Sequence, residues 1–251
     1  MNEGQSHHNL LPKLINAGEW DKTNAILSSI SDGAHSITLF SAEDFENCLG
    51  DPALAVRLEE AALACGFTQI EWHFVLRAPW TYFNSLYAEM SKQGVATSYQ
   101  SMLHEVMKNG SYSCASGDMR WYFEFEYNAS LRAFEAETRG ALVLHDFHAF
   151  CRGGAGSSLL LSLAKEHCID VLNAALAGAG SRIANNARAD RYAVEFRYVC
   201  NQLALNHNSM RAMKFTLLLP IVSWRLWAKA RAEKQLKEAF VKRFGANSGI
   251  A

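Results

Sequence analysis

The stretch that decides the fold of this chain covers residues 73–85 and reads His73-Phe74-Val75-Leu76-Arg77-Ala78-Pro79-Trp80-Thr81-Tyr82-Phe83-Asn84-Ser85. Aromatic and branched residues over 68–76 predict a β-strand. Pro79 is typical of the first position of a helix. Arg77 therefore stands where a strand ends and a helix is about to begin. Ligands of open α/β sheets gather at this carboxyl edge, so the segment is the candidate ligand site.

Outward from this segment, strands alternate with helices. We expect further strands over 36–40 and 141–145. We expect helices over 10–31, 52–66, 79–94, 98–110, 120–138, 187–209 and 211–244. Three strands alternating with helices predict an α/β fold with a short parallel sheet. We expect a single domain over 1–251, with an α/β part over 10–150 and a helical part over 151–251.

Composition limits the classes of protein that the chain can represent. The 251 residues include 24 basic and 25 acidic side chains, and 49% are hydrophobic. This near-neutral charge argues against a protein whose main task is binding nucleic acid. The six cysteines form no C-x-x-C pair, so we expect reduced thiols. Residues 1–8 lack the features of a signal peptide, and the apolar stretch 215–227 is too short to span a membrane, so we expect a cytoplasmic protein.

Arg77 and Ser85 have the chemistry of a phosphate site. An arginine offers a planar fork of donors that suits a phosphate, and a serine hydroxyl about two turns along the following helix could add a further bond. The alternative is structural. In that interpretation Arg77 pairs with a surface carboxylate, and Ser85 is an ordinary helix position.

A strand followed by Arg77, Pro79 and Ser85, with Tyr87 and Gly94 beyond, resembles the 3′-phosphate-binding segment of sulfotransferases. These enzymes use 3′-phosphoadenosine 5′-phosphosulfate as donor on a P-loop-like, three-layer α/β fold. The segment 40–45 is similar to the Ser-x-Glu segment of bacterial carbohydrate-type sulfotransferases, and the weaker likeness extends over residues 10–250.

The resemblance assigns a role to three residues. It implies that Arg77 and Ser85 hold the 3′-phosphate of the donor. It implies that Glu43 is the base that takes the proton from the hydroxyl of an acceptor, expected to be a carbohydrate. The alternative for Glu43 is a carboxylate stabilised by the positive end of a helix dipole.

One departure from the family concerns its phosphate loop. Sulfotransferases begin with a strand and a loop of the kind Gly-x-x-Lys-x-Gly-Thr-Thr, which binds the 5′-phosphosulfate. This sequence contains no such motif. We therefore expect a family member whose first strand and loop are missing. The alternative is a degenerate, non-catalytic member that acts as a nucleotide-binding or interaction module.

Three other patterns have two interpretations each. His145, Asp146 and His148 could serve a metal-assisted hydrolase, but metal binding needs another convergent ligand, and we expect no metal. The glycine-rich segment 152–158 could form an anion nest, but we expect a flexible connection. The segment 210–243 could lie on a membrane surface, but we expect its apolar side to pack on the domain and its charges to face water.

Overall fold

The computed structural model describes residues 10–31, 37–116, 119–151, 159, 190–203 and 213–245. The chain forms two compact units, each built from two stretches of sequence. Unit 1 comprises residues 1–72 and 101–142, and unit 2 comprises residues 73–100 and 143–251. The single domain over 1–251, with parts over 10–150 and 151–251, stays a prediction. Helices and strands are mixed, and there is a short parallel sheet, as the α/β prediction requires.

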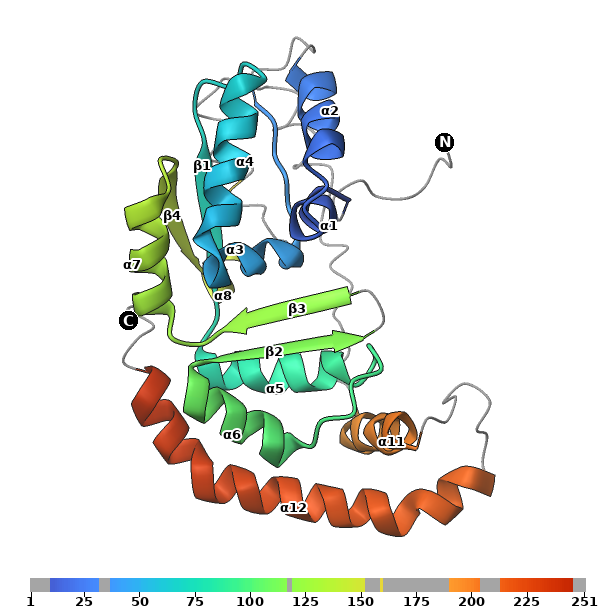
Figure 1. Ribbon diagram of the computed structural model, residues 1–251. Coiled ribbons are helices and arrows are strands. Elements are labelled where there is room, and N and C mark those ends of the chain that lie inside the picture. The colour runs from blue at the N-terminus through green and yellow to red at the C-terminus, as the bar shows by residue number, and fades with distance from the viewer. Residues whose placement is uncertain are drawn as a thin grey trace, which may run out of the picture. The chain divides into compact units, whose positions relative to one another are not determined.

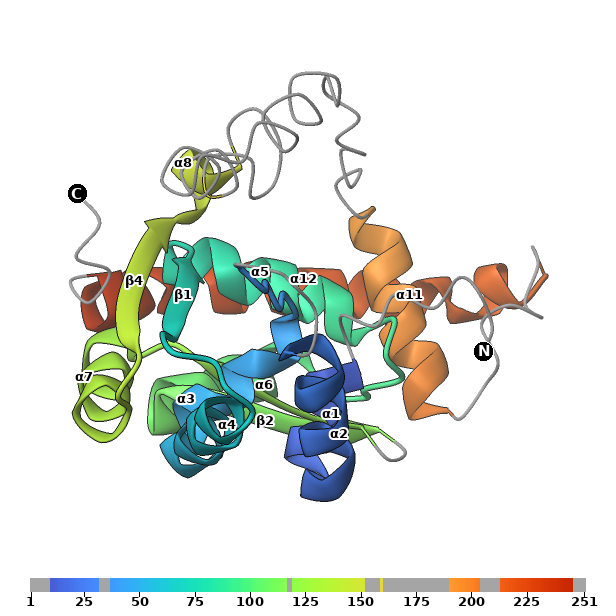
Figure 2. The same cartoon turned by 90° about the horizontal axis from the view of Figure 1, so that it is seen from above.

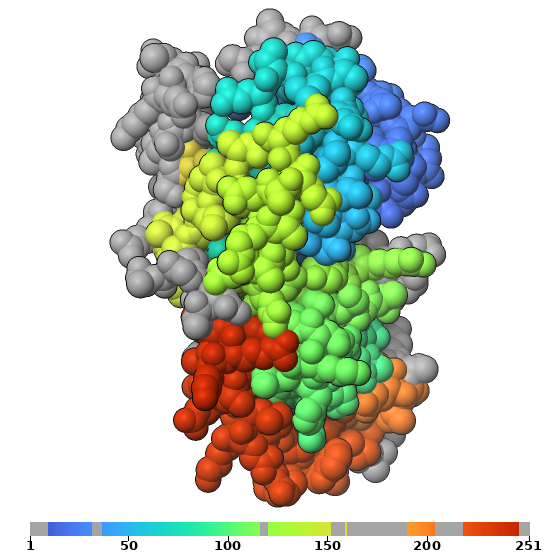
Figure 3. Space-filling model, turned by 60° about the vertical axis from the view of Figure 1, so that its left-hand side comes forward, coloured from blue at the N-terminus to red at the C-terminus, as the bar shows by residue number. Residues whose placement is uncertain are grey.

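Unit 1 is a layer of short helices beside a two-stranded hairpin (Figure 1). Its elements are α1 (Leu10–Asn16), α2 (Trp20–Ser31), the 3₁₀ turn η2 (Glu43–Glu46), α3 (Asn47–Gly50), α4 (Pro52–Ala64), β2 (Ser111–Ser116), β3 (Met119–Glu124) and α7 (Tyr127–Glu137). Pro52 begins α4 as expected, and Gly66 follows its end with a φ of +98°, a conformation that favours glycine. Figure 3 shows α7 lying against α4.

The hairpin corrects one expectation. We expected a helix over 120–138, but the helix begins only at Tyr127, and Met119–Glu124 is a strand antiparallel to Ser111–Ser116. Tyr112 pairs with Phe123 and Cys114 with Trp121. Bulky aromatic side chains are stable in a strand when a neighbouring strand supplies such partners. Pairing with Ser111–Ser116 therefore stabilises a strand here rather than the predicted helix.

A second correction concerns the expected strand over 36–40. Residues 37–40 form no strand in the structure, although Ile37, Thr38 and Phe40 have strand-favouring side chains. A strand requires a partner for its backbone groups, and propensity alone does not supply one. The parallel sheet therefore has two of the three expected strands.

Unit 2 is a helical assembly with aromatic side chains at its centre. Its elements are α5 (Pro79–Met90), α8 (Phe147–Phe150), α11 (Arg191–Gln202) and α12 (Met213–Phe244). Figure 1 shows α12 as a curved helix whose concave side faces α5 and α11, and both helices contact it. Phe240 of α12 packs on Trp80 and Phe83, with ring centroids 5.2 and 5.6 Å apart. This aromatic packing joins the two stretches of sequence that make up the unit.

The parallel pair consists of β1 (Glu71–Leu76) and β4 (Ala141–Asp146), which lie side by side (Figure 2). The boundary between the units passes through both strands, after Trp72 and after Leu142, and also through α6 (Tyr99–Asn109). Both strands and α6 appear where the sequence predicts them. Because the two strands are parallel, their carboxyl ends meet at one edge, which is the edge that Arg77 follows.

Candidate functional site

Arg77 lies directly after β1, and its guanidinium lies 4.6 Å from the centre of the Phe147 ring. Phe147 is the first residue after β4. The cation therefore rests on an aromatic ring that the neighbouring strand supplies, at the carboxyl edge of the pair. Stacking of this kind holds the flat face of a guanidinium against the ring. The N–H donors point outward in the guanidinium plane, where they can bind a ligand.

The start of α5 adds a second feature that favours an anion. Pro79 is at the beginning of this 12-residue helix, the first turn has no acidic residue, and Ala78 offers no side-chain cap. Backbone N–H groups at a helix start carry partial positive charge. Ser85 lies further along the same helix and is half-buried. The structure thus brings Arg77 and Ser85 into one strand–helix segment of unit 2.

A pair of histidines lies on the same strands. His73 Nδ1 and His145 Nε2 are 2.9 Å apart, and the two rings are stacked with an interplanar angle of 18°. Burial, and secondarily the nearby His73, lower the pKa of His145 below its usual 6.5. In a strand, alternate residues face one side, so His73 and Val75 share a face of β1, and Arg77 follows the end of the strand. The sequence offered no signal for the pairing of His73 with His145, because the two residues lie on strands that are far apart in the chain.

The beginning of the parallel pair is fixed by a buried carboxylate in unit 1. Glu59 of α4 is 1% exposed and accepts hydrogen bonds from Trp72 Nε1 at 2.8 Å, from the Arg139 amide at 2.8 Å and from the Gly140 amide at 2.9 Å. A side chain at Gly140 would collide with Trp72, since an added Cβ would lie 2.8 Å from its ring. These contacts set the start of β4 against β1.

Glu43, the expected base, is in a different unit from Arg77 and Ser85. It begins η2 in unit 1 and is exposed. Glu43 is in the first turn of η2, and the residue before the turn, Ala42, makes no side-chain cap. Arg77 and Ser85 belong to unit 2 and Glu43 belongs to unit 1, so the three predicted site residues are divided between the two units.

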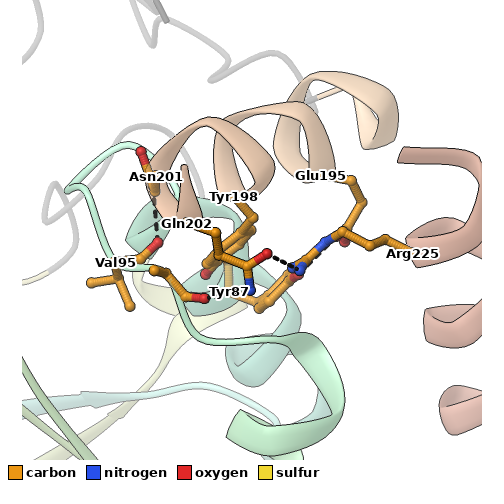
Figure 4. Close-up of polar contacts among 8 residues, drawn as sticks. Tyr87, Val95, Glu195, Tyr198, Asn201, Gln202 and Arg225 are labelled. Carbon is orange, nitrogen blue, oxygen red and sulfur yellow. Dashed lines mark hydrogen bonds and ion pairs between the residues drawn. The ribbon is translucent and has the colours of Figure 1, made fainter. Parts of the chain in front are cut away.

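A further polar cluster, which the sequence did not predict, lies inside unit 2 (Figure 4). Arg225 of α12 donates from Nε to Glu195 Oε2 of α11 at 2.9 Å and from Nη2 to the hydroxyl of Tyr87 at 3.3 Å. The Tyr87 hydroxyl donates to the same Glu195 oxygen at 3.0 Å. Arg225 also donates from Nη1 to Gln202 Oε1 at 3.1 Å.

This cluster holds three helices together. Asn201 of α11 donates to the carbonyls of Ser91 and Val95, which follow α5, at 3.0 and 2.9 Å. The Tyr198 hydroxyl donates to the Tyr87 carbonyl at 2.8 Å. The hydrogen bonds therefore join α5 to α11 and α12, and we assign the cluster a structural role.

The interior position of this cluster changes the proton affinity of its members. Burial, followed by the negative charge of Glu195, raises the pKa of the Tyr87 phenol far above its usual value. Burial lowers the pKa of Lys229, although Glu195 and Glu233 oppose this effect. The ammonium of Lys229 lies 4.9 and 4.8 Å from the ring centres of Tyr87 and Tyr99, which offsets part of the cost of its desolvation.

The cysteines within the described residues are reduced, as the sequence predicts. Cys48, Cys65, Cys114, Cys151 and Cys200 are free thiols, buried or half-buried. Burial raises the pKa of Cys48 to about 12, which makes its thiolate scarce at neutral pH. Cys168 lies outside the described residues.

The hydrolase alternative finds no geometric support in the described part of the chain. Among those residues, no three His, Cys, Asp or Glu side chains converge as a metal site would need. Asp146 Oδ1 instead accepts the amide hydrogen of Ala149 and caps α8. The glycine-rich segment 152–158 lies outside the described residues.

Comparison of this chain with models of known protein families, with curated proteins and with solved structures finds no match.

Proposed function

We propose that the carboxyl edge of β1 and β4 binds the 3′-phosphate of adenosine 3′-phosphate 5′-phosphosulfate and that the chain is a sulfotransferase-like protein. The observation that carries this proposal is the place of Arg77, at the end of a parallel strand and two residues before the uncapped start of α5. Phosphate groups bind where a guanidinium and a helix start lie at the carboxyl edge of a parallel sheet. A P-loop-like arrangement of the whole α/β part belongs to the same proposal.

In the reaction that we propose, a sulfuryl group moves from the nucleotide to a hydroxyl, expected to be that of a carbohydrate. The S–O bond to the 5′-phosphate breaks, and a bond forms between sulfur and the acceptor oxygen. The proton of the acceptor hydroxyl passes to a carboxylate, for which Glu43 is the candidate. The products are a sulfate ester and adenosine 3′,5′-bisphosphate.

Binding of adenosine 3′,5′-bisphosphate, measured by isothermal titration calorimetry, tests the proposed site. We expect binding by the wild type and a loss of about 10- to 100-fold on Arg77→Ala, since a hydrogen bond to a charged group contributes about 1.5–3 kcal/mol. Arg57→Ala is the matched control, because the Arg57 guanidinium also lies over an aromatic ring, 4.2 Å from that of Trp20. Equal binding by wild type and Arg77→Ala would reject the site.

A second candidate function follows from the absence of a Gly-x-x-Lys-x-Gly-Thr-Thr motif in the sequence. Without the contacts that such a loop makes to the 5′-phosphosulfate, the chain would bind the nucleotide and transfer nothing. An assay distinguishes sulfuryl transfer from nucleotide binding alone. The protein is incubated with a panel of saccharides and with donor that carries a label in its sulfuryl group. Labelled sulfate ester that disappears on Glu43→Gln supports transfer with Glu43 as base. Binding without labelled product supports the nucleotide-binding module.

A further inference from the structure

The outer side of α12 carries two exposed tryptophans, an arrangement that folding alone does not explain. Trp224 is 64% exposed and Trp227 58%, and Ile221 one turn earlier is 44% exposed. The inner side packs in the unit through Val222, Ala232, Phe240 and Phe244. The helix therefore buries one apolar side, as the sequence predicts, and presents a second group of large apolar side chains to solvent.

Basic residues continue the same side of the helix. At 3.6 residues per turn, one arc of about 140° on the helix holds a set that we call the Trp-basic face: Ile221, Trp224, Trp227, Arg231, Lys234 and Lys242. The charged members are exposed, and the Arg231 guanidinium lies 5.5 Å from the centre of the Trp227 ring. One acidic side chain, Glu238, is exposed within the same arc, between the positions of Trp227 and Arg231.

Helix α12 carries a net positive charge, whereas the rest of the chain carries a net negative charge. Residues 213–244 carry eight basic and two acidic side chains, a formal charge of +6, whereas the remaining residues carry 16 basic and 23 acidic, a formal charge of −7. Two of the basic residues of α12 are used internally, Arg225 by Glu195 and Lys229 by two tyrosine rings. The exposed basic side chains thus face solvent on a helix whose acidic partners are few.

We propose that the Trp-basic face binds the surface of an anionic phospholipid bilayer. Tryptophan has an apolar body and one N–H donor, and it is enriched where lipid meets water. Lysine and arginine near anionic headgroups each add about 1 kcal/mol of binding. The helix lies on the surface in this proposal, and none of the described helices is both long and apolar enough to cross a bilayer. Figure 3 shows the C-terminal turns of α12, in red, at the surface of the molecule.

The charge of the Trp-basic face argues against a second copy of the chain as the partner. A symmetric dimer through this face would bring Arg231, Lys234 and Lys242 of both chains into one interface, six basic side chains against two copies of Glu238. Like charges in contact weaken such an interface. An anionic surface neutralises them instead, while the tryptophans enter the headgroup layer.

Sedimentation of the full chain with vesicles tests this proposal, independently of the proposed enzymatic activity. The vesicles are phosphatidylcholine alone or an equal mixture with phosphatidylglycerol. We expect at least about tenfold tighter binding to the mixture, a blue shift of tryptophan fluorescence on binding, and weaker binding at high salt. The double variant Trp224→Ala, Trp227→Ala is expected to lose at least about tenfold in affinity and the blue shift.

Matched variants show whether vesicle binding depends on the Trp-basic face or on other exposed residues of unit 2. Tyr192→Ala removes an aromatic side chain of α11 that is 48% exposed and should leave vesicle binding unchanged. Lys242→Gln should weaken binding about fivefold, whereas Lys92→Gln on the turn after α5 should not. Circular dichroism should show the wild-type helix content in each variant, because the altered side chains are largely exposed.

Three outcomes overturn the proposal. The first is equal affinity of wild type and the double tryptophan variant for the mixed vesicles. The second is equal affinity of the wild type for the two kinds of vesicle. The third is a dimer, seen by analytical ultracentrifugation, that the double tryptophan variant abolishes while the wild type ignores vesicles, because the face would then be an interface between copies.

Discussion

At the scale of single residues, the buried carboxylate of Glu59 is stabilised by hydrogen bonds and positions the start of the strand pair. All three of its hydrogen bonds come from N–H donors, on Trp72, Arg139 and Gly140. A carboxylate is the side chain that can accept them all, because it has two acceptor oxygens and no donor. The residue thereby joins α4 to the beginning of the strand pair that carries Arg77.

We predict that Glu59→Gln lowers the free energy of unfolding by about 2 kcal/mol, because the amide NH₂ of glutamine faces one of the N–H donors and leaves it unsatisfied. Urea denaturation followed by circular dichroism measures the change. The control is Glu60→Gln, whose side chain is exposed on the same helix and should alter stability by less than about 0.5 kcal/mol. Equal stability of wild type and Glu59→Gln would mean that the hydrogen bonds contribute nothing.

At the scale of elements, α5, α11 and α12 are held by the ion pair between Arg225 and Glu195, whose side chains are 7% and 1% exposed. Removing one partner leaves a buried charge without compensation, which typically costs about 3–5 kcal/mol. We therefore predict that Arg225→Met destabilises the protein by that amount and that Glu195→Leu combined with Arg225→Met recovers most of it. Chemical denaturation of the two single variants and the double variant measures this cycle.

An exposed pair in the same unit is the control for that cycle. Lys92 and Glu89 are 2.6 Å apart, but their side chains are 50% and 43% exposed. Water screens such pairs, so Glu89→Gln should cost less than about 1 kcal/mol. If Arg225→Met cost no more than Glu89→Gln, the buried pair would not be what holds the helices.

The histidine pair between β1 and β4 predicts how stability depends on pH. Because burial and His73 lower the pKa of His145 below 6.5 in the folded protein, the unfolded chain binds the proton more readily. Stability should thus be full above about pH 6.5 and fall as the pH drops through that value toward the lowered pKa. Thermal unfolding of wild type and His145→Asn between neutral and mildly acidic pH measures this. A melting temperature that falls equally in both proteins would contradict the prediction.

Most helices of the chain could be predicted, because each has a local signal. Proline begins α4 and α5, and glycines with positive φ follow α4 and α6. The hairpin Ser111–Glu124 was missed because its stability lies in pairing between strands. The run of aromatic residues over 121–123 and the turn composition of Gly117-Asp118 were local hints. Sequence places Arg77 at a strand end, but the Phe147 ring on which it stacks follows another strand and lies 70 residues further along the chain.

At the scale of the whole molecule, each unit is assembled from two stretches of the chain. The core of unit 2 needs both, since Phe240 packs on Trp80 and Phe83. We predict that a fragment of residues 143–251 does not fold by itself, because it lacks α5. Near-ultraviolet circular dichroism and the dispersion of amide proton signals measure this. A cooperative thermal transition in the fragment would contradict it.

The central claim is that Arg77 recognises the 3′-phosphate of a nucleotide, and a comparison of two nucleotides tests it most directly. Calorimetry gives the affinities of wild type and Arg77→Ala for adenosine 3′,5′-bisphosphate and for adenosine 5′-monophosphate, which lacks only the 3′-phosphate. We predict that the wild type prefers the bisphosphate by at least about tenfold, and that Arg77→Ala loses most of this preference and keeps only what Ser85 and the start of α5 contribute, since the lost contact belongs to the 3′-phosphate. The same preference in both proteins, or none in the wild type, would contradict the claim.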